Sequence, residues 1–275
     1  MSVAAFFKRY PLLSYFFLAF AIPWIGVSLA VGPKFMRGEP LQLTDALLMF
    51  LLMLAGPGLA GPCLARLVDG DRGKRDLLAR LARWRVGWRW YAATLIFPAL
   101  ILAVLLALAL SRSPKFNPVF YAPGILIGLI AGLIEELGWM GFAFPRLQIR
   151  FGALTGAVLL GVIHSIWHMA ADYLGASVAL GSCWLPHFLM FIVSMTAMRI
   201  ILVWVYVNTR SLLLAQLMHA SSTGFLSILV PSLLSPAENT LFYAVYAVVL
   251  WLVVSIIAVK PGKDLVCTPS TNGTL

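Results

Sequence analysis

Long apolar runs separated by short polar segments dominate the chain. A transmembrane α-helix needs about 20 consecutive apolar residues. Runs of this length occupy residues 11–31, 43–67, 91–110, 122–144, 152–172, 185–207, 211–230 and 240–259. The pattern therefore predicts an all-α, polytopic helical membrane protein with about eight transmembrane helices, which form a single transmembrane domain over residues 1–260.

The basic residues predict how these helices are oriented. If the N-terminus is cytoplasmic, 15 of the 20 lysine and arginine residues fall at cytoplasmic ends, and Arg199 lies within a run. The outside ends carry only Lys34, Arg37, Arg112 and Lys115. By the positive-inside rule we expect an N-in, C-in topology, which explains the net charge of +10 without a nucleic-acid partner. We expect an integral multi-pass protein of a prokaryotic plasma membrane.

Residues 69–90 predict an interfacial amphipathic helix. In helical register, one stripe carries Leu77, Leu81, Trp84 and Trp88, while most of the basic residues, Lys74, Arg75, Arg80 and Arg83, lie off it. Such a helix rests on anionic lipid headgroups, which are therefore an expected partner. The polar segment 261–275 is expected to be a disordered cytoplasmic tail.

Polar residues within the apolar runs indicate a functional site. Glu135 and Glu136 lie in a run in which each ionised carboxylate costs about 2.5–3.5 kcal/mol, and no neighbour in that run supplies a counter-charge. His164 and His168 share one helical face at i and i+4, and His219 and Thr223 have the same spacing. A rise of about 1.5 Å per residue places Glu135 level with His164 and His168, whereas His219 would lie several ångströms shallower. His187, beside Pro186, is expected to be an interface residue.

Three chemistries fit these residues. A glutamate can act as general base on a water that a histidine also holds, while another histidine stabilises the oxyanion of peptide hydrolysis. Alternatively, Glu135, His164, His168 and His219 hold zinc, which activates the water. In the third alternative, the same residues relay protons or bind a cation in a carrier.

Three segments resemble motifs of the CPBP family (the CAAX prenyl protease and bacteriocin-processing family, also called ABI) of intramembrane endopeptidases. EELGWMGFAFPRL, residues 135–147, resembles the first motif, Glu-Glu-x-x-x-Arg followed by Gly-Phe and Pro-x-Leu. IHSIWH, residues 163–168, resembles the second motif, an aromatic residue followed three residues later by histidine. The segment around His219 is similar to the third motif, His-x-x-x-Asn. The resemblance covers about residues 45–225, with the protease core at 122–230.

The resemblance implies a role for each motif residue. Glu135 would activate water that His168 shares, Glu136 would support it, and His219 would contribute to the oxyanion site. Supporting positions would be Trp139, His164 and Thr223. The family cleaves membrane-associated substrates, including prenylated CAAX proteins, and we favour a glutamate-activated water without a metal cofactor over the zinc alternative.

Three departures from the motifs bear on activity. Met140 stands where the first motif has arginine, so Glu136 should be either neutral or paired elsewhere, and Arg146 is a poor substitute. Thr223 stands where the third motif has asparagine or aspartate, and His164 replaces the aromatic residue of the second motif. The leading hypothesis is an intramembrane endopeptidase. The alternatives are an inactive relative that acts as a membrane binding or immunity protein, and a proton- or cation-coupled carrier.

Overall fold

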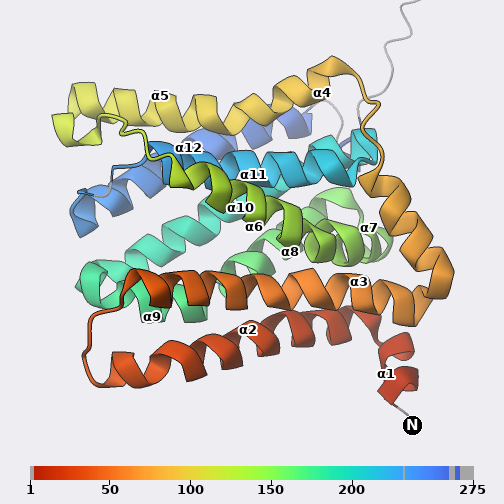
Figure 1. Ribbon diagram of the computed structural model, residues 1–275. Helices are drawn as coiled ribbons and strands as arrows, with labels where there is room; N and C mark the ends of the chain where they lie inside the picture. The colour runs from red at the N-terminus through yellow and green to blue at the C-terminus, as the bar shows by residue number, and fades with distance from the viewer. Residues whose placement is uncertain (1–2, 232, 260–263, 267–275) are drawn as a thin grey trace, which may run out of the picture.

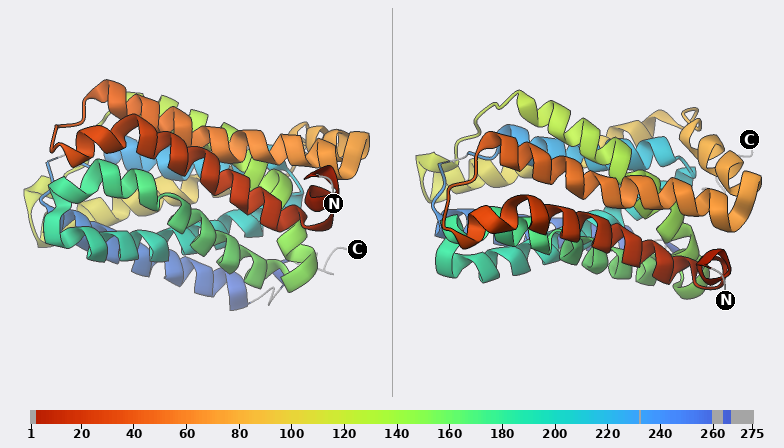
Figure 2. Two further views of the ribbon diagram at one scale, coloured as in Figure 1. Left: turned by 90° about the horizontal axis from the view of Figure 1, so that it is seen from below. Right: turned by 60° about the horizontal axis from the view of Figure 1, so that its bottom comes forward.

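The computed structural model describes residues 3–231, 233–259 and 264–266, and the regular secondary structure within them is helical. The helices lie side by side in an elongated bundle (Figures 1 and 2). Their bounds are α1 (Val3–Arg9), α2 (Pro11–Met36), α3 (Leu43–Leu81), α4 (Trp88–Ala92), α5 (Ile96–Ser111), α6 (Pro123–Gly138), α7 (Phe144–Phe151), α8 (Ala153–Trp167), α9 (Met169–Leu180), α10 (Trp184–Thr209), α11 (Leu212–Leu229) and α12 (Pro236–Val259). Short 3-10 turns are η1 (Ala93–Leu95), η2 (Pro114–Phe116) and η4 (Gly181–Cys183), and η3 (Trp139–Ala143) is a π-helical turn.

Helices of membrane-spanning length and composition confirm the polytopic all-α prediction. Within the described residues, 7 helical stretches are long and apolar enough to cross a bilayer: Pro11–Met36, Leu43–Leu81, Trp88–Ser111, Pro123–Phe151, Met169–Thr209, Leu212–Leu229 and Pro236–Val259. The predicted span 152–172 is divided, because α8 ends at Trp167 and α9 begins at Met169. The eight-helix count and the orientation stay predictions.

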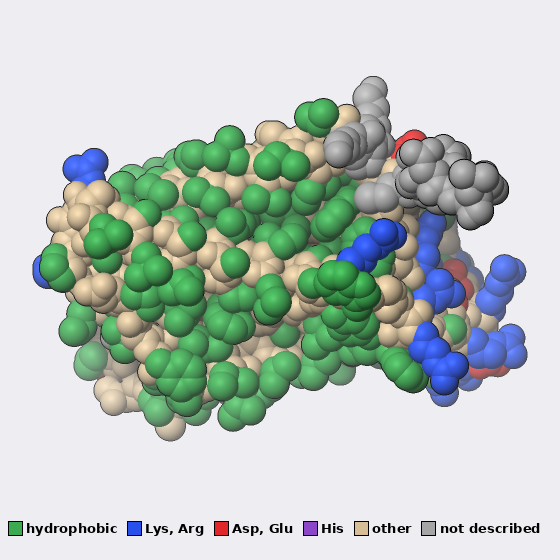
Figure 3. All heavy atoms as spheres, turned by 90° about the horizontal axis from the view of Figure 1, so that it is seen from above, with side chains coloured by type: hydrophobic (Ala, Val, Ile, Leu, Met, Phe, Trp, Pro, Cys, Tyr) green, Lys and Arg blue, Asp and Glu red, His purple; other side chains and the backbone are tan. Residues whose placement is uncertain are grey.

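The surface agrees with a protein embedded in a bilayer. Hydrophobic side chains cover the middle of the face in Figure 3, and lysine and arginine side chains gather mainly at one end of the bundle. The first helix, α1, and the last residues of α12 both lie at that end (Figures 1 and 2). The protein is an integral multi-pass membrane protein.

The amphipathic helix predicted for residues 69–90 is shorter than expected. Helix α3 bends at Gly70, whose φ of 64° and ψ of −146° are not helical, and then continues only to Leu81. Residues 82–87 are not helical, because side chains from elsewhere satisfy their carbonyls: Ser211 Oγ donates to the Arg83 carbonyl (2.6 Å) and the Tyr91 hydroxyl to that of Trp84 (2.5 Å). The predicted stripe is therefore interrupted after Leu81, and its contact with headgroups stays a prediction.

The predicted disorder of residues 261–275 is wrong for the part that the structure describes. Leu265 is fully buried, and its carbonyl accepts a hydrogen bond from Asn208 Nδ2 at 2.8 Å. This contact fixes Asp264–Val266 against the end of α10. Residues 261–263 and 267–275 lie outside the described residues.

Helix α6 packs in backbone contact with α11 along a line of glycines spaced four residues apart. A Cβ atom added at Gly128 would lie 2.4 Å from Gly224 Cα, and one at Gly132 would lie 2.5 Å from the Ala220 nitrogen. Small residues at this spacing let membrane helices approach closely. The next turn of α6 carries Glu135 and Glu136, so this packing brings both glutamates to α11.

Candidate active site

The two glutamates point towards different neighbours from the end of α6. Both are buried, with Glu135 4% and Glu136 0% exposed. Successive residues of an α-helix point about 100° apart, so Glu135 contacts α8 while Glu136 contacts α10 and α11. The two carboxylates therefore occupy separate environments.

Glu136 forms a bidentate ion pair with Arg199 of α10. Arg199 Nη1 lies 2.7 Å from Glu136 Oε1 and 2.8 Å from Oε2, and both residues are fully buried. His219 Nδ1, on α11, donates to the same Oε1 at 2.6 Å. Of the two states predicted for Glu136, the structure shows the one paired elsewhere. Sequence reasoning had found Arg199 but assigned it no partner, although an arginine inside an apolar span is expected to have one.

The immediate partner of Glu135 is His164, which the sequence had placed at the same height as Glu135, together with His168. His164 Nε2 lies 2.9 Å from Glu135 Oε2, and Trp139 Nε1 donates to the same oxygen at 3.4 Å. His219 Nε2 lies 4.0 Å from it. The contacts of Glu135 thus fall on Oε2, and within the described residues Oε1 accepts no hydrogen bond.

The same guanidinium determines which nitrogen of His164 carries the proton. Arg199 Nη2 lies 2.6 Å from His164 Nδ1. A guanidinium can only donate hydrogen bonds, so His164 Nδ1 is the acceptor. In a neutral imidazole the proton is then on Nε2, which donates to Glu135.

His168 lies where the fifth predicted span breaks, between α8 and α9. Its ring packs 4.7 Å from the Trp167 ring and 5.2 Å from that of His164. Its Nε2 is buried and has no hydrogen-bond partner among the residues described. His168 is therefore close to the glutamates without contacting them, and one of its nitrogens is available to a bound molecule.

His219 lies level with the glutamates, whereas the rise per residue had predicted a position several ångströms shallower. Helix α11 begins at Leu212 after a turn in which Arg210 has a φ of 55°, and Ser211 is fully buried. Ser211 is thus buried beside the exposed Arg210, and its hydroxyl donates to the Arg83 carbonyl. The positions of His219 Nδ1 at 2.6 Å from Glu136 and of Nε2 at 4.0 Å from Glu135 place His219 at the height of the glutamates, which the sequence estimate had missed.

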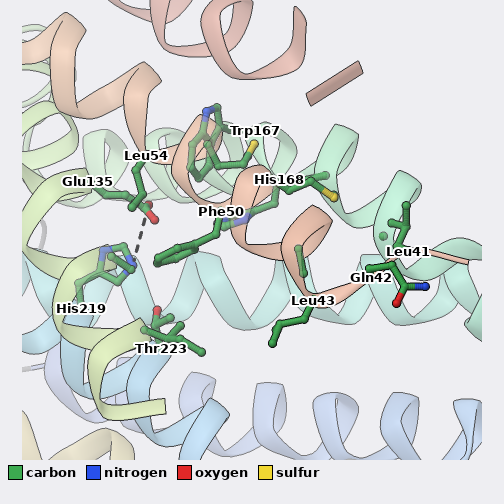
Figure 4. Close-up of a pocket in the computed structure, with 17 residues that line it drawn as sticks. Leu41, Gln42, Leu43, Phe50, Leu54, Glu135, Trp167, His168, His219 and Thr223 are labelled. Carbon is green, nitrogen blue, oxygen red and sulfur yellow. Dashed lines mark ion pairs between the residues drawn. The ribbon is translucent and has the colours of Figure 1, made fainter. Parts of the chain in front are cut away.

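A cavity of 540 Å³ opens beside these side chains (Figure 4). Glu135, His168, His219 and Thr223 contribute polar groups at one end, Gln42 lies beside Leu41 farther along, and the remaining lining is mainly apolar, largely from α3, α6 and α9. Phe50 and Leu54 of α3 lie near the polar side chains, whereas Leu41 and Leu43 lie farther along (Figure 4). The cavity therefore combines a polar end with an apolar wall.

Two further sequence predictions concern Arg146 and His187, which do not line this cavity. Arg146 does not replace the motif arginine, because it donates to Asp69 Oδ2 (2.5 Å) and to the Phe142 carbonyl (3.0 Å). His187 is 7% exposed, packs on Tyr243 with ring centroids 4.8 Å apart, and lines a separate cavity. Neither residue contacts the glutamates.

Donor atoms of Glu135, His164 and His168 all lie within 4.8 Å of one another, a set that could hold a metal ion. The contacts of His164 do not fit that role. A metal-bound histidine usually donates its other ring N–H to an acceptor, but His164 Nδ1 faces a guanidinium, which is a donor. His164 Nε2 then carries a proton and has no lone pair for a metal.

Comparisons with known proteins agree with the motifs. The family model for type II CAAX prenyl endopeptidases, Rce1-like, matches residues 117–225. This range contains both glutamates, Arg199 and the site histidines. CAAX prenyl protease 2 of Methanococcus maripaludis is 29% identical over 190 residues, which cover 62% of this chain and 69% of that relative. The motifs, the helical membrane fold and both comparisons support membership of the CPBP family of CAAX-type intramembrane proteases, to which this chain is similar.

Proposed function

We propose that the protein hydrolyses a peptide bond of a membrane-associated protein or peptide, CAAX-like and prenylated or other, with water activated by Glu135. The observation that carries this proposal is the position of Glu135. Its carboxylate lies at the polar end of the 540 Å³ cavity, with His219 Nε2 at 4.0 Å. A water in this cavity can hydrogen-bond to Glu135 Oε1, because the contacts with His164 and Trp139 fall on Oε2.

We assign a residue of this chain to each step of the reaction. Glu135 takes a proton from the water as its oxygen attacks the scissile carbonyl, and the carbonyl oxygen becomes an oxyanion. His168 Nε2 helps to hold the water. His219, protonated on both nitrogens, and the Thr223 hydroxyl donate to the oxyanion. The carbon–nitrogen bond then breaks, and Glu135 returns the proton to the leaving amine.

The charges of the buried cluster suit this assignment. The base form of Glu135 and the ion-paired Glu136 carry two negative charges, and Arg199 carries one positive charge. Because buried charges are tolerated only when paired, we assign the second positive charge to His219. Glu136 holds it through Nδ1 at 2.6 Å, so Nε2 faces Glu135.

The proposed reaction uses no metal ion. The support is the hydrogen bond from Arg199 to His164 Nδ1, which leaves His164 without a lone pair for zinc. Dialysis against a chelator should leave the cleavage rate unchanged. Stoichiometric zinc in the purified protein, with activity that returns only on adding zinc, would overturn this part of the proposal.

Arg199 also bears on the alternative of an inactive binding protein. Met140 had weakened the enzyme hypothesis because Glu136 lost its motif arginine. The ion pair from α10 supplies that charge at 2.7 Å. We also propose that the protein lies in the plasma membrane of a prokaryote. The end of α3 would contact anionic lipids there.

The test uses purified protein in liposomes with a panel of membrane-anchored peptides, prenylated and unprenylated. Glu135→Gln keeps the size of the side chain but removes the base, and His168→Ala removes a water ligand. We expect the first variant to abolish cleavage and the second to slow it at least about 100-fold. Glu39→Gln, the same change at an exposed position, is the matched control. Cleavage that survives Glu135→Gln would refute the assignment of the base.

A further inference from the structure

One guanidinium connects both glutamates of the site. Arg199 reaches Glu136 with Nη1 at 2.7 Å and 2.8 Å, and His164 Nδ1 with Nη2 at 2.6 Å. His164 Nε2 in turn lies 2.9 Å from Glu135 Oε2. Arg199, His164 and Glu136 are at most 1% exposed and Glu135 is 4% exposed, so water does not compete for these contacts.

We propose that Arg199 and His164 form a positioning pair, in which the arginine fixes the Nε2–H tautomer of His164 so that this histidine orients the base Glu135. The inference rests on the proposed function, since it assigns the residues that hold its base. His164 holds Oε2, and Oε1 remains without a partner among the described residues. The carboxylate thus has one anchored oxygen and one oxygen free to accept a proton.

The same contacts exclude His164 as a proton carrier. A second proton on His164 would have to bind at Nδ1, which faces Arg199 Nη2 at 2.6 Å. Two N–H groups cannot point at each other at this distance, so proton uptake would break the contact with the guanidinium. His164 therefore acts through Glu135 and does not itself exchange protons with the substrate.

Two departures from the family motifs, at positions 140 and 164, are connected through Arg199. Arginine is absent at position 140, on the same helix as the glutamates, and Arg199 supplies the charge from α10 instead. From α10 the guanidinium can also reach α8, where histidine stands at the position of the motif's aromatic residue. Arg199 and His164 therefore depend on each other.

The first test compares His164→Gln with His164→Phe. Glutamine offers an N–H donor but neither titrates nor replaces imidazole as a metal ligand, whereas phenylalanine fills the space without a donor. We expect His164→Phe to lower kcat roughly 10- to 100-fold, the rate equivalent of one hydrogen bond to a charged group, with KM unchanged. His164→Gln should recover most of that loss. Equal thermal unfolding profiles of both variants confirm that each folds.

Two outcomes of this comparison would overturn the inference. If His164→Phe is as active as wild type, His164 only fills space. If His164→Gln is as inactive as His164→Phe, the imidazole is needed for proton transfer or metal binding, and positioning is refuted.

The second test does not depend on cleavage. Nitrogen NMR of the ¹⁵N-histidine-labelled protein in detergent, with the His164 signal assigned by its loss in His164→Gln, reports the tautomer. We expect proton on Nε2 and none on Nδ1 in wild type, and a mixture of tautomers in Arg199→Lys, whose single ammonium stays on Glu136. An Nδ1–H tautomer in wild type, or an unchanged spectrum in Arg199→Lys, would refute the pair even if the protein is active. If wild type cleaves no peptide, the proposed function fails and this spectrum alone decides whether the pair exists.

Discussion

Arg199 and Glu136 depend on each other because both charges are fully buried. Breaking a buried ion pair by removing one partner costs about 3–5 kcal/mol, because an unpaired charge remains in a medium of low polarity. The charge at position 199 is therefore needed for stability as well as for the site. The motif arginine cannot simply be added back at position 140, since Glu136 already has its partner.

Met140→Arg should destabilise the protein. Met140 is fully buried, and a second guanidinium there would find Glu136 already engaged by Arg199 and His219. We expect a clear fall in Tm in detergent for Met140→Arg and also for Arg199→Met. The double variant should be more stable than either single one, because one arginine again meets Glu136. Additive losses in the double variant would show that position 140 cannot reach Glu136 in this protein.

The π-helical turn Trp139–Ala143 connects the glutamates to the basic end of α3. A π turn shifts the backbone hydrogen bonds from i−4 to i−5 and so disturbs the regular pairing of carbonyls. Arg80 donates to two of these carbonyls, those of Gly141 at 2.7 Å and Met140 at 3.3 Å. It also donates to the Tyr206 hydroxyl at 2.8 Å. The sequence had placed this arginine towards the headgroups, but it points into the protein.

Arg80→Met should therefore lower Tm, because carbonyls next to the site lose a charged donor. Each hydrogen bond to a charged group is worth about 1.5–3 kcal/mol. Arg75→Met, an exposed arginine on the same helix, is the control and should leave Tm unchanged. Equal effects of the two substitutions, measured by thermal unfolding in detergent, would contradict an inward role for Arg80.

The contact between α6 and α11 determines whether the glutamates meet His219. Gly128→Ala would place a Cβ atom 2.4 Å from Gly224 Cα, so the two helices must separate. We expect a lower Tm and at least a roughly 10-fold lower cleavage rate, because the 2.6 Å contact between Glu136 and His219 is lost. Gly32→Ala is the matched control, since nothing lies within 4 Å of its added Cβ. A wild-type rate in Gly128→Ala would show that this packing does not position the site.

The whole bundle is asymmetric, with its basic side chains gathered mainly at the end that also holds α1 and the last residues of α12 (Figures 2 and 3). By the positive-inside rule we expect this end to face the cytoplasm. The cavity and both glutamates lie within the helical bundle. The orientation therefore decides from which side a substrate's peptide reaches them.

Single-cysteine labelling tests that orientation. In a variant whose native cysteines are replaced by serine, Lys115→Cys should react with a membrane-impermeant maleimide on intact bacterial cells. Arg75→Cys should react only after the cells are opened. Both native side chains are exposed, so burial does not limit either reaction. The opposite labelling pattern would reverse the predicted topology.

The order of residues was enough to predict the helical membrane fold, because hydrocarbon requires long apolar helices whatever their packing. It also identified Glu135, Glu136, His168 and His219 as site candidates, since polar groups in apolar spans stand out and their spacing follows motifs. Helix ends were less certain, as at Leu81, because hydrogen bonds from distant residues end a helix that periodicity would continue.

Only the tertiary structure decided which of these groups touch. Periodicity gives the face of a helix but not its rotation or height relative to neighbouring helices. Backbone contact at the glycines of α6 and the buried start of α11 determine both, and they bring His219 to Glu136. The ion pair from Arg199 joins residues 63 positions apart. For that reason a lone arginine in one apolar run and an unpaired glutamate in another became partners only when the helices were packed together.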